Sequence, residues 1–307
     1  MSSPRQRLGF IGLGNLGRPL AANLLHAGFP LTVHDQNEAA AHDLVAAGAT
    51  WSASPQEAGA CSDTVFTCLP SPRVVDEVVT GERGLLEGLA TGGTWIDSST
   101  NDRHELLRLA ALAEARGVAC LEAPVTGGVH LAAAGQITVL VGGAPDVYAA
   151  HLPAFEAIGG RVFYIGPLGS ASVIKVITNM LAFIHLVAAG EALMLARRGG
   201  LDLAQSFEVI KASSGTSFVH ETESQVILNG SYDIGFTLDL ACKDLHFAHE
   251  LGSELGVPLE LGSLVEQIFV RAREQYGGSA WSPMVVKLLE DAVGTDLRAP
   301  GFPSTIE

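Results

Sequence analysis

The sequence predicts an α/β protein with an N-terminal, doubly wound parallel sheet and an all-helical C-terminal domain, joined by a long interdomain helix. From Leu8 to Ile165, short apolar runs alternate with helical patterns, as in successive β-α-β units. After Gly169, apolar residues recur only with the helical period of about 3.6. The chain-breaking residues from Gly166 to Gly169 therefore predict a boundary between domains at 1–168 and 169–307.

The first domain is predicted element by element from apolar runs and the residues that end them. Gly28, Gly48 and Gly117 each close a helical pattern, where glycine favours the left-handed conformation. Pro55 and Pro72 lie early in two further helical patterns, where the missing N–H has no helical partner to lose. The strands are expected at 8–13, 31–34, 64–69, 93–97, 118–123, 137–143 and 161–166, with helices between them.

Only helices are predicted in the second domain. The first of them is the most membrane-like part of the chain, but Lys175, His185 and Glu191 would be costly in lipid. We therefore expect a helix that is apolar all round and buried in protein, with a membrane span as the minor alternative. The helices are expected at 172–197, 202–212, about 237–255, 258–275 and 283–292, followed by an extended tail.

The composition favours a small-molecule partner. The 307 residues include 18 Lys and Arg against 33 Asp and Glu, a net charge of −15, which disfavours nucleic acid and anionic membranes as partners. The four cysteines, Cys61, Cys68, Cys120 and Cys242, lack zinc-ligand spacing, so we expect a reduced, cytoplasmic protein without a metal site. The histidines at 246 and 249 likewise lack a third ligand at a metal-binding spacing.

A glycine-rich loop follows the first predicted strand and opens the first predicted helix. Gly12, Gly14 and Gly17 form the pattern G-x-G-x-x-G, in which backbone N–H groups and a helix N-terminus can bind a pyrophosphate. The strand before it and the helix after it supply the context that this motif requires. The predicted cofactor loop consists of Gly12, Leu13, Gly14, Asn15, Leu16 and Gly17.

An acidic residue at the end of the second predicted strand indicates which dinucleotide binds. The carboxylate of Asp35 can accept hydrogen bonds from the adenosine ribose hydroxyls and would repel a 2′-phosphate. Gln36 and Asn37 follow it, and neither offers a cation to hold that phosphate. The sequence therefore favours NAD over NADP.

Two polar residues on the long apolar helix are candidates for catalysis. Lys175 and Asn179 are four residues apart and so share one helix face. Burial of a lysine disfavours its charged form, which suits a general base for an alcohol, although a lysine that extends its amine to solvent is the alternative.

Five motifs in order resemble those of the β-hydroxyacid dehydrogenase family, which includes 3-hydroxyisobutyrate dehydrogenase. The resemblance runs from about Leu8 to Leu289 and implies a Rossmann domain, a helical domain and an active site in the cleft between them. The motifs are GFIGLGNLGRPLAANL at 9–24, CLPSP at 68–72, DSST at 97–100, EAPVTGG at 122–128 and GPLGSASVIKVITNM at 166–180, completed by KDL at 243–245.

The resemblance implies roles for particular residues. Lys175 corresponds to the catalytic lysine of the family, and Asn179 would orient both this lysine and the substrate. Lys243 corresponds to the lysine that closes over cofactor and substrate. The other implied contacts are Leu69, Pro70 and Thr100 on the nicotinamide side of the cofactor, and Thr126, Gly127, Gly128 and Phe218 around the substrate.

The implied reaction is hydride transfer between NAD and a small 3-hydroxy acid of the 3-hydroxyisobutyrate, serine or tartronate semialdehyde type. Several departures from the family pattern leave the particular acid open. They are Glu122 where Asp is more common, Thr126 where Ser is common, Ala171 where Gly is usual, Thr178 where Asn is expected and Phe218 where several relatives carry Trp.

Other functions stay open beside this one. Imine reductases share the two-domain plan but do not use the Lys–Asn pair, and a catalytically silent NAD-binding oligomer would not need it. Six-phosphogluconate dehydrogenase would have a longer helical domain than this chain and a cluster of basic residues that binds phosphate.

Two further features are open or predicted from the sequence. His220 and Glu221 would either contact the substrate or lie in a solvated loop. Apolar residues within 173–195 and 264–289 predict a homodimer or homotetramer.

Overall fold

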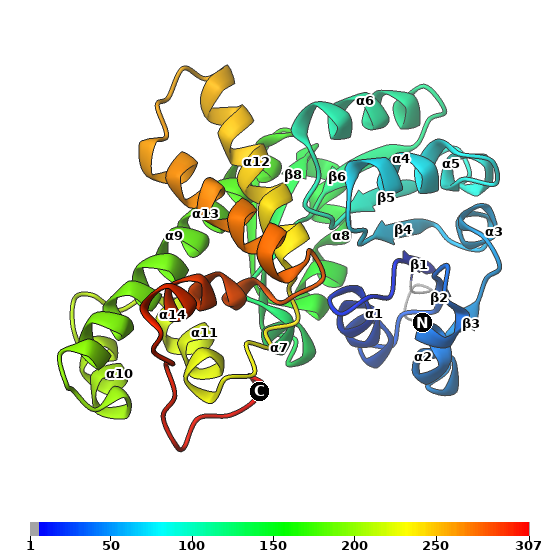
Figure 1. The fold of residues 1–307 in the computed structure, drawn as a ribbon. Coiled ribbons are helices and arrows are strands. Elements are labelled where there is room, and N and C mark those ends of the chain that lie inside the picture. Colours follow the sequence, from blue (N-terminus) through cyan, green and yellow to red (C-terminus); the bar gives the residue numbers. More distant parts are fainter. Residues whose placement is uncertain (1–5, 307) are drawn as a thin grey trace. The chain divides into compact units, whose positions relative to one another are not determined.

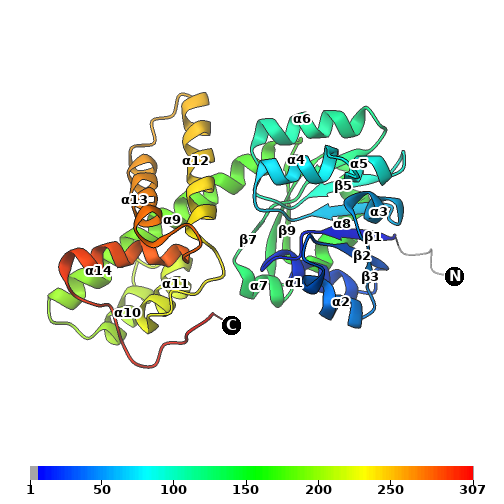
Figure 2. The ribbon, with the colours of Figure 1, turned by 45° about the vertical axis from the view of Figure 1, so that its right-hand side comes forward.

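The computed structural model describes residues 6–306 and separates into two compact units, Met1–Lys175 and Val176–Glu307. In the first unit, helices cover both faces of a sheet, which confirms the predicted doubly wound α/β fold (Figures 1 and 2). The second unit is built from helices, as predicted. The predicted boundary after residue 168 lies just before helix α9, whereas the two compact units separate within that helix.

The sheet is mainly parallel and carries the core of the first unit. Its strand order is β3-β2-β1-β4-β5-β6-β8-β7, and β9 pairs with β8. Strand β8 runs antiparallel to β6 and β7, because the connection through β7 and α7 reverses the chain direction. The strands are β1 (Leu8–Ile11), β2 (Leu31–His34), β3 (Thr50–Trp51), β4 (Thr64–Thr67), β5 (Thr94–Asp97), β6 (Ala119–Glu122), β7 (Val125–Thr126), β8 (Ile137–Gly143) and β9 (Gly159–Gly166).

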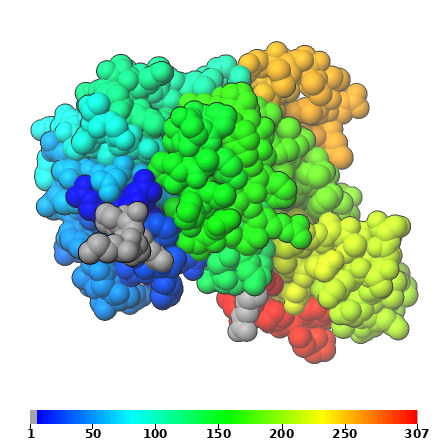
Figure 3. All heavy atoms as spheres, turned by 180° about the vertical axis from the view of Figure 1, so that it is seen from behind, coloured from blue at the N-terminus to red at the C-terminus, as the bar shows by residue number. Residues whose placement is uncertain are grey.

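Five helix boundaries of the first unit lie at residues that the sequence indicates, whereas α5 and α7 were not predicted. Pro55 and Pro72 occupy the first turns of α3 and α4, and Gly28, Gly48 and Gly117 have positive φ after α1, α2 and α6. These helices are α1 (Gly17–His26), η1 (Glu38–Ala41), α2 (His42–Ala46), α3 (Pro55–Ala60), α4 (Pro72–Thr80), α5 (Leu85–Gly88), α6 (Arg103–Glu114), α7 (Val129–Ala133) and α8 (Pro145–Ile158). From behind, the green surface of α8 and β9 borders the blue surface of the first elements, where α8 packs against α1 (Figure 3).

The second unit packs its helices around one apolar core. Phe183, Leu186 and Phe269 are buried in it together with residues of α10 to α14. Among residues 167–306, strand pairing is limited to a bridge between Thr237 and Trp281. The helices are α9 (Ser170–Arg198), α10 (Leu203–Lys211), α11 (Phe218–Asn229), α12 (Leu238–Glu254), α13 (Glu260–Tyr276), η2 (Ser282–Val286) and α14 (Lys287–Val293).

Two expectations for the helices are corrected by the structure. Helix α11 was not predicted, although Ser217 caps its N-terminus by accepting from the His220 N–H, and Gly230 ends it in the left-handed conformation. Helix α9 is not buried all round, because Leu181 and Leu195 are exposed on it. By length and composition α9 could cross a membrane, but its apolar residues also supply part of the core of the second unit.

The tail after α14, residues 294–306, has no regular secondary structure and is held against the rest of the second unit by hydrogen bonds. The buried carboxylate of Glu290 accepts from the guanidinium of Arg298, the hydroxyl of Tyr232 and the N–H of Leu297. Further along, the side-chain amide of Asn229 donates to the Phe302 carbonyl over 2.9 Å. The tail is therefore an ordered part of this unit.

Candidate functional site

The three glycines of the cofactor loop play three different physical roles. Gly12 follows β1 with φ +95°, a conformation that a side chain would strain. A Cβ on Gly17 would collide with the carbonyl of Gly12, so this glycine permits close packing of α1 on the loop. A Cβ on Gly14 would meet no atom within 4 Å. The loop thus leaves open space at Gly14, where a pyrophosphate has to approach the backbone.

The N-terminus of α1 is suited to an anion. Its N-cap residue is Leu16, which makes no side-chain capping bond, and the first turn contains no acidic residue. The backbone N–H groups of a first helical turn carry a partial positive charge that favours a phosphate. These features fit the predicted dinucleotide site, in which the backbone of Gly12, Leu13, Gly14, Asn15, Leu16 and Gly17 would hold the pyrophosphate.

Asp35 lies directly after β2 and is tied to the glycine loop. Its Oδ2 accepts from the N–H of Leu13 over 2.7 Å, and its Oδ1 accepts from the N–H of Asn37 over 2.8 Å. The carboxylate is thereby held in a fixed place beside the loop. This is where the family of dinucleotide-binding folds positions the residue that contacts the adenosine ribose.

The loops after β1, β4 and β5 meet at the carboxyl edge of the sheet. A Cβ on Gly12 would lie 2.9 Å from the Cδ2 of Leu69, so the glycine loop and the loop after β4 are in contact. The N–H of Leu69 donates to the Oγ of Ser99 over 2.9 Å, which joins the loop after β4 to the loop after β5. Pro70 and Thr100 are the next residues in these two loops.

A buried carboxylate that the sequence reasoning left without a role holds this edge together. Asp97, the last residue of β5, accepts from the hydroxyl of Thr67, the N–H of Ser99 and the side-chain amide of Asn101. Burial raises the pKa of Asp97, while the hydrogen bonds from Ser99, Asn101 and Thr67 oppose this rise. Asp97 is the first residue of the DSST motif, and its place in that motif was the sequence signal that could have indicated this role.

The predicted substrate loop has a backbone that only glycine adopts readily. Gly127 and Gly128 have φ +128° and +90°, and Gly128 is the N-cap of α7. Thr126 precedes them at the end of β7, where it pairs with Thr138. The two glycines therefore shape this loop without presenting side chains of their own.

Lys175 is buried in the first unit, near the carboxyl edge of the sheet. Its side chain is 7% exposed. Burial raises the pKa of the Cys68 thiol to about 12, and the charge of Lys175 acts on this thiol in the opposite direction. The amine is therefore close to the loop that follows β4, the loop that carries the predicted nicotinamide contacts.

Asn179 and Lys243 are joined by a third residue that was not predicted. The buried carboxylate of Asp244 accepts from the Nδ2 of Asn179 over 2.6 Å and from the Nζ of Lys243 over 2.7 Å. The ammonium of Lys243 also lies 4.8 Å from the ring centroid of Phe247. Asp244, the middle residue of KDL, thus fixes the orientation of two candidate site residues at once.

Near the start of α11, His220 is buried in the helix packing, whereas Phe218 is exposed. His220 is buried, with its Nε2 3.0 Å from the Phe207 carbonyl and its Nδ1 3.2 Å from the Ser224 hydroxyl, so it supports the helix packing. Glu221 is hydrogen-bonded to the hydroxyl of Thr216, and Phe218 is 54% exposed. A role of Phe218 with the substrate stays a prediction.

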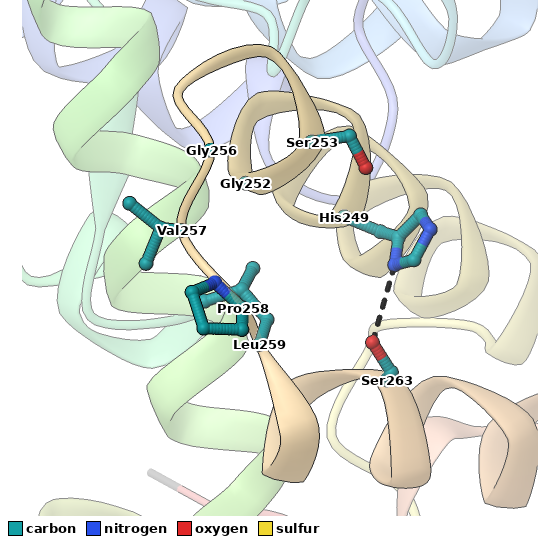
Figure 4. Close-up of a pocket in the computed structure, with 8 residues that line it drawn as sticks. All are labelled: His249, Gly252, Ser253, Gly256, Val257, Pro258, Leu259 and Ser263. Atoms are coloured by element: carbon teal, nitrogen blue, oxygen red, sulfur yellow. Dashed lines mark hydrogen bonds between the residues drawn. The ribbon is translucent and has the colours of Figure 1, made fainter.

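A separate hollow of about 510 Å³ lies at the turn between α12 and α13. His249 and Ser253 of α12 and Ser263 of α13 line it, and the His249 ring is hydrogen-bonded to Ser263 over 3.2 Å (Figure 4). His246 and His249 both lie near the carboxylate of Glu266. Within residues 6–306 there is no group of three or more His, Cys, Asp or Glu side chains that could hold a metal ion.

Comparison with protein families matches nearly the whole chain to dinucleotide-dependent enzymes. Residues 7–166 match the NAD-binding domain of 6-phosphogluconate dehydrogenase. Residues 169–289 match the NAD-binding domain of NADP-dependent 3-hydroxyisobutyrate dehydrogenase.

Individual relatives match most of the length of this chain. The chain is 34% identical over 292 residues to 2-(hydroxymethyl)glutarate dehydrogenase of Eubacterium barkeri, covering 95% of this chain and 97% of that protein. It is 36% identical over 269 residues to the mitochondrial 3-hydroxyisobutyrate dehydrogenase of Mus musculus, covering 85% and 80%. A solved structure of 3-hydroxyisobutyrate dehydrogenase from Mycobacterium tuberculosis with L-serine has a TM-score of 0.82 at 31% identity, covering 93% and 99%.

The open space at Gly14 generates a test of the dinucleotide site. In a Gly14→Ala variant, we expect the free energy of unfolding to stay within about 0.5 kcal/mol of the wild type, because the new methyl group meets no atom. We expect NADH to bind about tenfold or more weakly, because the methyl group would block hydrogen bonds to the pyrophosphate. Thermal unfolding and NADH fluorescence titration measure the two quantities. Unchanged NADH affinity would contradict this site, and Gly17→Ala serves as the comparison that should lose stability.

Proposed function

The chain belongs to the β-hydroxyacid dehydrogenase family, of the 3-hydroxyisobutyrate dehydrogenase type, and from this we propose that it transfers a hydride between NAD and the hydroxyl-bearing carbon of a small 3-hydroxy acid. Its dinucleotide-binding domain and its relatives support the class of hydroxyacid dehydrogenase. The acids that the named relatives act on, 3-hydroxyisobutyrate and 2-(hydroxymethyl)glutarate, share a hydroxyl group and a carboxylate.

Lys175 is the proposed general acid and base. The bound dinucleotide supplies the hydride acceptor in oxidation and the hydride donor in reduction. During oxidation the Nζ of Lys175 takes the proton of the substrate hydroxyl, and during reduction it returns a proton to the forming hydroxyl oxygen. Asn179 lies one helical turn further along α9, and its side-chain amide donates to Asp244. We assign this amide to the orientation of the substrate near its hydroxyl oxygen.

The substrate carboxylate needs partners of its own. We assign Thr126, Gly127 and Gly128 to it, because small residues in this loop leave N–H groups accessible to an anion. By the family resemblance, Lys243, which is oriented by Asp244, would add a positive charge that suits the same carboxylate. Holding the acid at one end fixes the reacting carbon relative to the cofactor, which is a large part of the rate that such an enzyme can gain.

The burial of Lys175 close to the carboxyl edge of the sheet is the single observation that carries this assignment. In a Lys175→Ala variant we expect kcat to fall at least about a hundredfold, because proton transfer by a positioned group contributes at this scale. NADH affinity should stay within twofold, and Lys211→Ala, which removes an exposed lysine from α10, should retain the wild-type rate. A near-normal rate for Lys175→Ala would overturn the mechanism.

The substrate is identified by a panel assay of the wild type. NAD reduction is followed at alkaline pH with 3-hydroxyisobutyrate, serine, phenylserine, glycerate, threonate and sulfonated analogues. Turnover of at least one of these acids is expected. Silence with all of them, while NADH still binds, would favour the imine reductase or the catalytically silent oligomer, which the Lys175–Asn179 pair disfavours.

We propose NAD rather than NADP as the cofactor, because the carboxylate of Asp35 lies beside the glycine loop, where it would repel the 2′-phosphate of NADP. Replacing Asp35 by Ser removes this negative charge, so we expect the ratio of kcat/KM for NADP to that for NAD to rise about tenfold or more. Parallel assays with both cofactors measure the ratio. Glu38→Gln, which neutralises an exposed acid nearby, should leave it unchanged. A wild type that already prefers NADP would refute the proposal.

We further propose that the enzyme is a homodimer or homotetramer that works in a reducing compartment such as the cytoplasm. Leu181 and Leu195 of α9 and Leu261 and Leu264 of α13 are large apolar side chains that remain exposed in a single chain. All four cysteines are free. Sedimentation equilibrium should give a multiple of the 32.0 kDa chain mass, and a species of that mass alone would contradict the assembly.

A further inference from the structure

The start of α9 is held by an acidic residue from the sheet. Glu122, the last residue of β6, is 1% exposed. Its Oε1 accepts from the N–H of Ala171 over 2.8 Å, and its Oε2 accepts from the N–H of Ser172 over 2.8 Å. The hydroxyl of Ser172 and the backbone of Gly169 also donate to this carboxylate. One side chain therefore binds the backbone at three positions around the beginning of the helix, Gly169, Ala171 and Ser172, and also the hydroxyl of Ser172.

This arrangement caps the N-terminus of α9 from a distant part of the chain. The first turn of α9 contains no acidic residue, and the carboxylate of Glu122 accepts from its buried N–H groups at Ala171 and Ser172 and complements the positive end of the helix dipole. Burial raises the pKa of Glu122, and the hydrogen bonds from Ser172, Ala171 and Gly169 oppose this rise. The carboxylate is thus tied to the helix terminus and to the strand at the same time.

The anchored residues lie one turn before the proposed catalytic lysine. Ser172 precedes Lys175 by three positions and Ala171 precedes it by four, so all three share one face of the helix. Strand β6 is paired in parallel with β5, and Glu122 is the register partner of Asp97. Glu122 therefore fixes the first turn of α9 to the same edge of the sheet at which the cofactor loops converge.

The neighbouring strand leaves room for this carboxylate. Gly142 of β8 is the register partner of Glu122, and a Cβ at Gly142 would lie 3.0 Å from both Cγ and Cδ of Glu122 and closer still to Oε1. Gly142 has no positive φ, so its backbone would accept alanine. The need for glycine here is steric, and an alanine would displace the carboxylate without changing its charge.

We propose that Glu122 is a positioning residue of the reaction: by clamping the first turn of α9 to the carboxyl end of β6, it sets where the amine of Lys175 stands relative to the bound cofactor. The proposal rests on the function proposed above for Lys175. Glu122 itself touches neither substrate nor cofactor in this role. It acts through the helix.

The first test separates positioning from stability. We expect Glu122→Gln, which keeps the shape but loses the charge and one acceptor oxygen, to lower kcat about tenfold to a hundredfold, because small displacements of a catalytic group have effects of this size. NADH affinity should stay within twofold, because the glycine loop is not altered. Rates are measured with the fastest acid of the panel. Glu114→Gln, an exposed acid at the end of α6, is the matched control and should retain full activity.

The second test asks whether the effect passes through Lys175. In a Lys175→Ala background, Glu122→Gln should change the residual rate less than twofold, because no amine remains to be positioned. An equal loss in both backgrounds would mean that Glu122 only supports the structure, and would overturn the proposal. Full activity of Lys175→Ala would instead refute the proposed function. Full activity of Glu122→Gln alone would refute only the clamp.

Two further measurements keep the test decisive if Glu122→Gln folds poorly. Gly142→Ala should lower kcat in the same direction with little change in NADH affinity, because it displaces the same carboxylate. Amide hydrogen exchange needs no turnover: the N–H groups of Ala171 and Ser172 should exchange at least tenfold faster in Gly142→Ala than in Glu114→Gln. Equal exchange in the two variants, together with an unchanged kcat, would overturn the proposal.

Discussion

The in-register parallel pairing of β1, β2, β4, β5 and β6 is the constraint on which the site depends. Parallel strands end at the same edge of a sheet, so the residue that follows each strand is brought beside those of its neighbours. Gly12, Asp35, Cys68 and Ser98, which directly follow β1, β2, β4 and β5, are far apart in sequence but share this edge. Hydrogen bonds such as that from the Leu69 N–H to Ser99 then join the loops into one surface.

Buried carboxylates organise the functional residues on both units. Asp97 and Glu122 end neighbouring strands in the first unit, and Asp244 lies on α12 in the second. Removing a carboxylate from water is costly unless donors surround it, and each of the three has at least two. Each carboxylate thereby restricts the groups that donate to it. The loop after β5, the start of α9, and the Asn179–Lys243 pair owe their orientation to these acids.

Local patterns sufficed for most elements. Proline at the start of α3 and α4, and glycine after α1, α2 and α6, predicted the boundaries, because these residues act within one turn of the chain. Helix α11 was missed although Ser217 and Gly230 bound it, since its apolar residues show no clear one-sided pattern until their packing is known. For the same reason, apolar content alone could not show that Leu181 and Leu195 of α9 remain exposed.

The sequence by itself determined the α/β class, the glycine loop, Asp35 and the Lys175–Asn179 spacing, because each depends on residues close together in the chain. Only the tertiary structure decided that Glu122 caps α9, that Asp97 joins the loop after β5 to the end of β4, and that Asp244 holds both Asn179 and Lys243. The contacts of Glu122 with Ala171, of Asp97 with Thr67 and of Asp244 with Asn179 connect positions distant in sequence. Their partners are chosen by strand register and helix packing, which a local pattern does not specify.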